Sequence, residues 1–116
     1  MPKKRGEKMQ LDEKYVFHIP LFKYANGELV SINICDLVED LISKFGENGF
    51  ENLYIVKSKG FYKSRSYDEL LITIYTTSNN SPDQIFKRWF KENNDILQQE
   101  ALAYENNNRM FIENLI

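Results

Sequence analysis

Apolar and polar residues alternate with a period of two in the first part of the chain, between about Lys14 and Tyr24. The two sets of alternating positions are Tyr15, Phe17, Ile19 and Leu21, and Val16, His18, Pro20 and Phe22. This period predicts a β-strand, and the mixed second set predicts that both of its faces are partly covered. Pro20 cannot donate a hydrogen bond to a neighbouring strand, which predicts a sheet edge or a bulge there.

A turn and a helix are predicted next. The pair Asn26 and Gly27 favours a turn because both residue types accept positive φ, and extended chain resumes after it. From Asn33, a good N-cap residue, the apolar period becomes 3.6. The apolar positions on one face of this helix are Ile34, Leu37, Val38, Leu41, Ile42 and Phe45. Gly46 predicts a left-handed end to the helix.

Two further strands are predicted from β-branched and aromatic content at residues 53–56 and 68–77. Gly60 indicates a bulge or bend, so the first of these strands can continue past it before the chain turns within residues 63–68. Residues 57–67 are therefore expected at the end of a hairpin.

A second helix has the clearest start signal. Ser81 as N-cap, Pro82 at the first helical position and Gln84 three residues after the serine predict a capping box. The buried side is expected to hold Ile85, Phe86, Trp89 and Phe90. Residues 101–104 and 110–112 then flank an asparagine cluster at 106–108, which predicts a terminal strand or hairpin. A continuation of the second helix through residues 96–116 is the alternative.

The order strand, helix, strand, strand, helix, strand predicts an α+β, ferredoxin-like βαββαβ sandwich. An antiparallel sheet would carry two helices on one face, with an extra C-terminal hairpin. On the segments Gly60-Phe61-Tyr62 and 98–102, the chain resembles small ferredoxin-like domains of uncharacterised bacterial families. RNA-recognition motifs share the element order, and Lys59-Gly60-Phe61 matches the first three positions of their sequence box. The match ends at Tyr62, where that box has a small residue.

Composition agrees with one folded domain. The chain has 116 residues, of which 42% are hydrophobic and 14% aromatic. We expect a flexible basic tail over residues 1–10 and a single domain over 11–116. No apolar run is long enough for a membrane helix and no secretory signal precedes the domain, so we expect a cytoplasmic protein without membrane contact.

Charge is distributed unevenly. The net charge is -2, yet residues 57–67 carry four cations, no acid and three aromatic side chains. Such a local exception favours contact with an anion, although a solvated loop is the alternative interpretation. The anion-binding candidates are Lys57, Lys59, Phe61, Tyr62, Lys63, Arg65 and Tyr67. A secondary basic surface is expected at Lys87, Arg88 and Lys91.

Signals for catalysis are weak. His18 is the only histidine, and no partner for it is readable in the sequence. Cys35 is the only cysteine, and burial as a small apolar residue is expected for it. The adjacent acids Asp68 and Glu69 are interpreted as surface charge. No catalytic residue, metal site or cofactor is therefore predicted.

The leading hypothesis is a non-enzymatic binding or regulatory module that forms a homodimer. Its basic hairpin would contact a nucleotide, a nucleic acid or an acidic protein surface. The alternative is a small enzyme on a dimeric ferredoxin-like barrel, in which His18 and tyrosines such as Tyr54 line a pocket between the sheet and the helices. A protein-directed inhibitor or adaptor, including one from a mobile element, is a third reading that composition permits.

Overall fold

The predicted strands and helices follow one another along the chain in the expected order, and further short elements lie between them. The computed structural model describes residues 5–62 and 64–116, and of Tyr62 only the backbone. The strands are β1 (Glu13–Pro20), β2 (Phe22–Ala25), β3 (Glu28–Ser31), β4 (Leu53–Tyr62), β5 (Arg65–Thr76), β6 (Ala101–Asn106) and β7 (Arg109–Asn114). The helices are α1 (Cys35–Glu47), α2 (Asp83–Glu92) and α3 (Asn94–Leu97).

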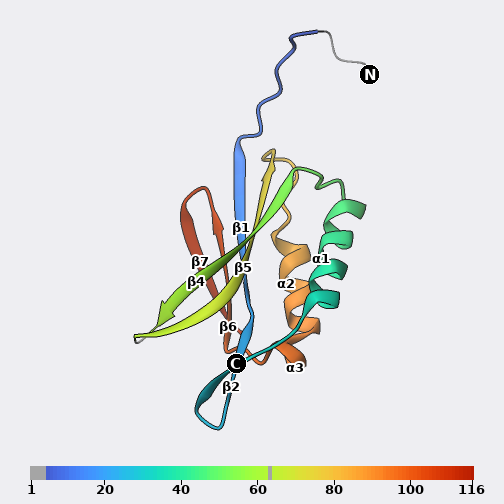
Figure 1. The fold of residues 1–116 in the computed structure, drawn as a ribbon. Coiled ribbons are helices and arrows are strands. Elements are labelled where there is room, and N and C mark those ends of the chain that lie inside the picture. Colours follow the sequence, from blue (N-terminus) through green and yellow to red (C-terminus); the bar gives the residue numbers. More distant parts are fainter. Residues whose placement is uncertain (1–4, 63) are drawn as a thin grey trace.

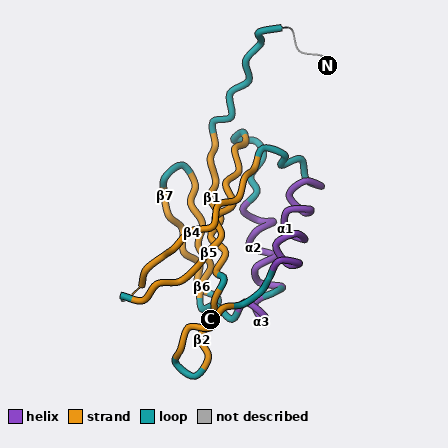
Figure 2. The backbone as a smooth tube through the Cα atoms, in the orientation of Figure 1, coloured by secondary structure: helices purple, strands orange, loops and turns teal. Residues whose placement is uncertain are grey.

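The main sheet is antiparallel, with strands in the order β4-β5-β1-β6-β7. β1, α1, β4, β5, α2 and β6 form the βαββαβ unit, and both longer helices lie on one side of the sheet (Figures 1 and 2). The ferredoxin-like sandwich is confirmed. β7 adds the C-terminal hairpin, so the alternative of a continued second helix is wrong. β2 and β3 form a separate hairpin.

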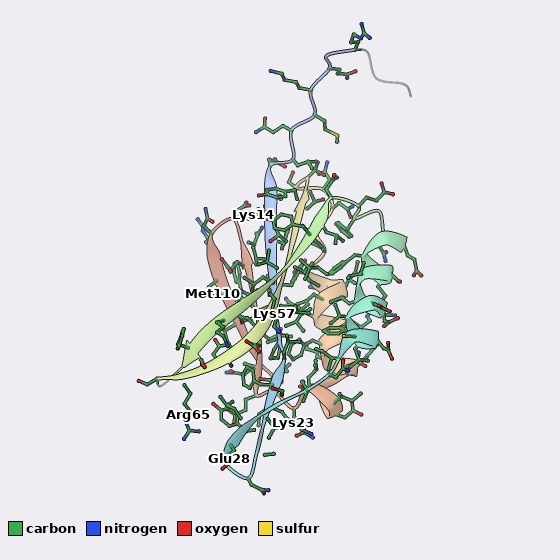
Figure 3. The ribbon with its side chains drawn as sticks, in the orientation of Figure 1. Lys14, Lys23, Glu28, Lys57, Arg65 and Met110 are labelled. Atoms are coloured by element: carbon green, nitrogen blue, oxygen red, sulfur yellow. The ribbon has the colours of Figure 1, made fainter. Side chains whose placement is uncertain are left out.

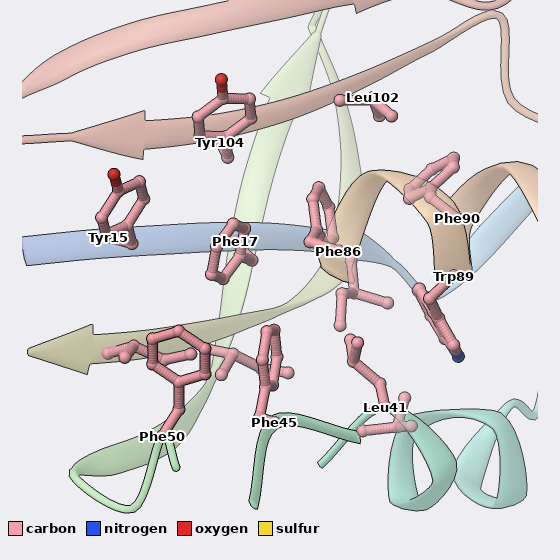
Figure 4. Close-up of a cluster of buried hydrophobic side chains, with 14 of the residues drawn as sticks. Tyr15, Phe17, Leu41, Phe45, Phe50, Phe86, Trp89, Phe90, Leu102 and Tyr104 are labelled. Carbon is pink, nitrogen blue, oxygen red and sulfur yellow. The ribbon is translucent and has the colours of Figure 1, made fainter. Parts of the chain in front are cut away.

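The core fills the space between the sheet and the helices. Alternate residues of β1 point into it, and Phe17 at its centre is fully buried, with its ring 4.6 Å from that of Phe86 on α2. The indole Nε1 of Trp89 donates a hydrogen bond to the carbonyl of Leu37 at 2.9 Å, which ties α2 to α1. Figure 4 shows these rings between the strands and the helices. We call this side of the sheet the covered face and the opposite side the open face.

The first strand differs from its prediction in length and position. One strand over 14–24 was expected, but β1 ends at Pro20, and the amide of Leu21 donates to the carbonyl of Asp68 at 3.0 Å instead. β1 is also central rather than an edge, with β5 on one side and β6 on the other. Pro20 is tolerated because pairing with β6 covers only residues 15–18.

The limits of α1 also differ from their prediction. The helix begins at Cys35, and the side-chain oxygen of Asn33 accepts a hydrogen bond from the Cys35 amide at 3.2 Å. Gly46 lies inside the helix, and the left-handed residue is Gly49, with φ of 86°. Cys35 is exposed, so its predicted burial is wrong, because it occupies the first turn away from the apolar stripe.

The start of α2 lacks the predicted capping box. Pro82 has φ of -84° and ψ of -5°, and its carbonyl accepts a hydrogen bond from the Phe86 amide at 3.3 Å. The proline therefore begins the helical path as expected, but no side chain caps the free amides. Buried Phe86, Trp89 and Phe90 confirm the predicted inner side of the helix.

Two tight turns confirm the reading of asparagine and glycine. Asn26 and Gly27 join β2 to β3 with φ of 54° and 78°, and Asn107 and Asn108 join β6 to β7 with φ of 51° and 68°. Both loops use residues that tolerate positive φ at low cost. Within the described ranges, no helix combines the length and the apolar character required to cross a membrane.

Candidate functional site

The open face of the sheet carries a cluster of one histidine and two carboxylates. His18 lies on β1, Glu69 on the neighbouring β5 and Glu105 on the neighbouring β6. Strand register explains why they meet. Glu69 is paired with Pro20, and Glu105 is paired with Val16, so both glutamates occupy positions diagonal to His18 on the same face.

The histidine bridges the two carboxylates. Its Nε2 lies 2.7 Å from Oε2 of Glu105, and its Nδ1 lies 3.4 Å from Oε2 of Glu69. The side chains of His18 and Glu69 are 19% and 14% exposed, and that of Glu105 is 32% exposed. Three ionisable groups are thus held together in a partly buried position, where charge interactions are less screened than at an open surface.

The side chains beside this cluster on β6 are small. Ala103 is the cross-strand partner of His18 on β6, and Ala101 is the next residue along the same face. Neither can reach over the histidine ring. On the open face, the β6 positions beside the histidine therefore carry methyl groups alone.

An aromatic groove of about 1000 Å³ lies at the adjoining end of the sheet. It is lined by Phe22, Tyr24, Arg65, Tyr67, Gln98, Gln99, Glu100 and Ala101. The ring centroids of Phe22 and Tyr67 are 4.8 Å apart. The rings of Phe22 and Tyr24 pack edge to face, with their centroids 6.1 Å apart. The amide nitrogen of the Gln99 side chain donates to the carbonyl of Phe22 at 2.8 Å, which holds one wall of the groove to the other.

Gly60 determines where the ring of Tyr67 lies. The two residues are paired across β4 and β5, and a Cβ atom at position 60 would overlap the tyrosine ring. The glycine predicted to mark a bulge instead permits this close approach. Burial raises the pKa of the Tyr67 phenol, and the charge of Glu69 and the nearby Tyr24 raise it further.

The groove and the carboxylate cluster are parts of one surface. Tyr67 and Glu69 are two residues apart on β5, so their side chains share the open face. Ala101 lines the groove and shares a face of β6 with Ala103. The groove therefore adjoins the carboxylate cluster on the open face.

The predicted basic segment lies on the projecting hairpin of β4 and β5, as expected (Figure 3). Lys57 and Lys59 are both close to Asp68, at 4.0 and 3.3 Å, which partly neutralises them. Their strand positions place them on the covered face, opposite Tyr67. Phe61 on that side is 72% exposed. The side chain of Tyr62 and the whole of Lys63 lie outside what the structure describes.

Arg65 and Tyr67 are the members of that segment that line the groove. Arg65 donates a hydrogen bond from its guanidinium to the carbonyl of Gly27 at 3.3 Å, which links the hairpin to the β2–β3 turn. The local positive charge of the sequence thus drew attention to two residues at one end of the groove, although charge is not what forms the groove.

Two of the three cations in the second predicted basic surface are paired with acids. Lys87 is 3.7 Å from Asp83 and its ammonium lies 5.3 Å from the centre of the Tyr104 ring. Lys91 is 3.1 Å from Glu113. Arg88 is exposed. The contacts of Lys87 with Tyr104 and of Lys91 with Glu113 hold α2 against β6 and β7.

Glu69 and Glu105 were not identified as site residues from the sequence. Glu69 was assigned to surface charge, and Glu105 precedes the asparagine cluster without any motif around it. The alternation of strand residues places both on the face of His18, but only the strand order shows that β5 and β6 flank β1. The predicted pocket between the sheet and the helices is wrong, because strand register places both His18 and Tyr54 on the open face. Tyr54 lies on β4, and β5 separates it from β1. No group of three or more histidine, cysteine or acidic residues suited to a metal occurs among the residues described.

Comparison with known proteins identifies a similar fold. No protein-family model matches the chain, and no curated protein matches its sequence. A phage SAM lyase in complex with S-methyl-5'-thioadenosine matches with a TM-score of 0.63 and 15% identity, over 97% of this chain and 96% of the other. The apo form of phage SAM lyase matches with a TM-score of 0.61 and 16% identity, over 94% and 96%.

These solved structures are similar to this chain in fold, and they are structures of an enzyme. At 15% and 16% identity, the likeness is one of fold.

Proposed function

We propose that the chain is a small enzyme that binds S-adenosylmethionine on the open face and cleaves it to S-methyl-5'-thioadenosine. One observation carries the proposal: the carboxylate pair of Glu69 and Glu105 lies next to an aromatic groove, on a fold similar to that of phage SAM lyase. The substrate combines an adenine ring, a sulfonium and an ammonium, and the two parts of the surface match these features.

The groove suits the adenine ring. Flat heterocycles stack on aromatic side chains, and Phe22, Tyr24 and Tyr67 offer such surfaces on one wall. Tyr67 also presents a phenol that stays neutral beyond the ordinary range, because its pKa is raised. An adenine bound there needs no charge on the protein.

The carboxylates suit the positive centres. A sulfonium and an ammonium both carry full charge, and Glu69 and Glu105 are partly buried anions that can stand close to them. Such carboxylates hold the substrate in place and exclude competing anions from the sulfur.

The reaction balances without a resident cofactor. A lyase that releases S-methyl-5'-thioadenosine breaks the bond between sulfur and the four-carbon side chain, and the electron pair stays on sulfur, which becomes neutral. Because no water is added, an oxygen of the substrate's own carboxylate forms a bond to the carbon that loses sulfur. The four-carbon fragment then leaves as a cyclic ester, and no proton has to be removed. The protein's part is to bind, fold the substrate and keep water out.

The test is a cleavage assay with purified protein. S-adenosylmethionine is incubated with the wild type, Glu69→Gln and Glu105→Gln, and S-methyl-5'-thioadenosine is measured by liquid chromatography and mass spectrometry. We expect product from the wild type and little from either variant, with Glu39→Gln on α1 as a control that keeps activity. Absence of product from the folded wild type would contradict the proposal.

We also propose that copies of the chain associate through the open face, as the sequence-based expectation of a homodimer suggests. Exposed apolar side chains surround the carboxylate cluster there: Tyr54, Val56, Tyr75, Met110 and Ile112. Association would cover these groups and restrict water at the site. Light scattering combined with size exclusion measures the subunit number, and a monomer at micromolar concentration would contradict this proposal.

A further inference from the structure

His18 makes contacts at both ring nitrogens, and both contacts are to carboxylates. Nε2 is 2.7 Å from Glu105 and Nδ1 is 3.4 Å from Glu69. A neutral imidazole has one N–H and can donate to one of them only, whereas an imidazolium donates to both. The bridged arrangement is therefore satisfied in full by a cation held between two anions.

The same two carboxylates are those assigned above to the positive centres of the substrate. An imidazolium and a sulfonium compete for them, because each cation lowers the negative potential that attracts the other. The chain thus supplies its own cation to the site when no substrate is bound.

We propose that His18 is a positioning residue whose proton competes with the cationic substrate for Glu69 and Glu105, so that the site binds substrate more tightly as His18 loses its proton. The inference rests on the proposed function. It adds a regulation of the site by pH, and it assigns His18 no direct contact with reacting atoms.

The surroundings leave His18 as the titratable cation beside the carboxylates. On β1, Lys14 shares the face, but its ammonium lies over the Tyr75 ring, 5.9 Å from the centroid. On β5, the other ionisable side chains of the open face are Tyr75, Tyr67 and Arg65. Arg65 also lines the groove, together with Tyr24 and Glu100.

The outer strands add no charge to this face within the described part of the chain. By strand register, the open-face positions are Tyr54, Val56, Ser58 and Gly60 on β4, and Met110, Ile112 and Asn114 on β7. β6 contributes Glu105 with Ala101 and Ala103. The local balance of charge therefore changes from -1 to -2 when His18 loses its proton.

Nuclear magnetic resonance tests the bridge without substrate. His18 is the only histidine, so untagged protein gives one set of imidazole signals that can be followed against pH. We expect Glu69→Gln to change the signal of Nδ1 and Glu105→Gln to change the signal of Nε2, because each variant alters the carboxylate that faces that nitrogen. Glu39→Gln is the control. Ring nitrogen signals that are unaffected by both site variants would overturn the bridge.

Kinetics tests the competition. We expect the KM for S-adenosylmethionine to fall with rising pH through the titration of His18, by at most about tenfold per pH unit, with kcat less affected. His18→Asn should remove this dependence, and the comparison with it cancels the titration of the substrate's own amino group. Lys14→Gln should retain the dependence. Binding of neutral S-methyl-5'-thioadenosine to the wild type should vary much less across the same range.

The outcomes separate the two proposals. Cleavage with a KM that follows the same pH profile in the wild type and in His18→Asn would overturn the competition alone. Failure of the folded wild type to bind or cleave S-adenosylmethionine at any pH would overturn the proposed function, and the competition with it.

Discussion

The covered and open faces of one sheet are built from the same strands but serve different ends. On β1, Phe17 points to the helices and is fully buried, whereas His18 points the other way and bridges two carboxylates. On β6, Tyr104 is buried among rings, whereas Glu105 is a third exposed. Because successive residues of a strand point to opposite faces, the residues that stabilise the fold lie on the covered face and the ionisable cluster lies on the open face.

The largest expected effect is a loss of stability, and it tests the difference between the covered and the open face. Phe17→Ala should lower the free energy of unfolding by about 3–5 kcal/mol, because it leaves a cavity among Phe45, Phe86 and Tyr104. Val16→Ala, on the open face next to it, should cost about 1 kcal/mol or less. Urea denaturation measures both. Equal losses would mean that the open face is as tightly packed as the core.

The second effect concerns activity. Glu69→Gln should lower kcat/KM for S-adenosylmethionine by about 100-fold, since it removes a charge that faces the positive centres of the substrate. Its unfolding free energy should change little, because the glutamate belongs to no core contact. Steady-state kinetics and urea denaturation on the same sample distinguish loss of function from loss of fold. Lys59→Gln, on the covered side of the hairpin, serves as a charge-changing control that keeps activity.

A third, smaller effect comes from Gly60. Gly60→Ala places a methyl group against the ring of Tyr67, which must move, so the affinity for S-methyl-5'-thioadenosine should fall by about tenfold. Gly46→Ala is the matched control, because nothing lies within 4 Å of its new methyl group. It should leave affinity unchanged and raise stability by at most about 1 kcal/mol. Isothermal titration calorimetry decides, and an unaltered affinity in Gly60→Ala would show that the tyrosine ring does not position the ligand.

The smallest effect is a dependence of stability on high pH. Folding raises the pKa of Tyr67 above its ordinary value of 10.0, so the folded state holds this proton more tightly than the unfolded state. The resulting stability is fully present below pH 10 and is lost as the pH rises through the folded value. Tyr67→Phe should therefore lose less stability than the wild type between pH 9 and pH 11. Parallel loss in both proteins would contradict this assignment.

Much of the covered face was predictable from the sequence. The 3.6 period of the helices and the period of two in β1 identify the residues that pack, and Phe17, Leu41, Phe86 and Trp89 are all buried as those periods require. The asparagine and glycine turns were also predictable, because few residues accept positive φ. The residues at which helices and strands begin and end were harder to predict, as the start of α1 and the break at Leu21 show.

The open-face site was largely hidden. Glu69 and Glu105 are 36 residues apart in the chain, and they meet only because β5 and β6 lie on either side of β1. Such neighbours leave no local spacing to recognise. Charge density drew attention to residues 57–67 instead, and among the side chains of this segment that the structure describes, those of Arg65 and Tyr67 line the groove. The pairing of Lys57 and Lys59 with Asp68 depends on cross-strand register, which the sequence does not reveal.

The most direct test of the account is a map of backbone amide chemical shifts during titration with S-methyl-5'-thioadenosine. The account predicts that the largest changes occur at Phe22, Tyr67 and Ala101, with smaller changes at His18 and Glu69 and none along α1. Changes confined to Lys57, Lys59 and Phe61, or no saturable change at any residue, would contradict the assignment of the open face as the ligand site.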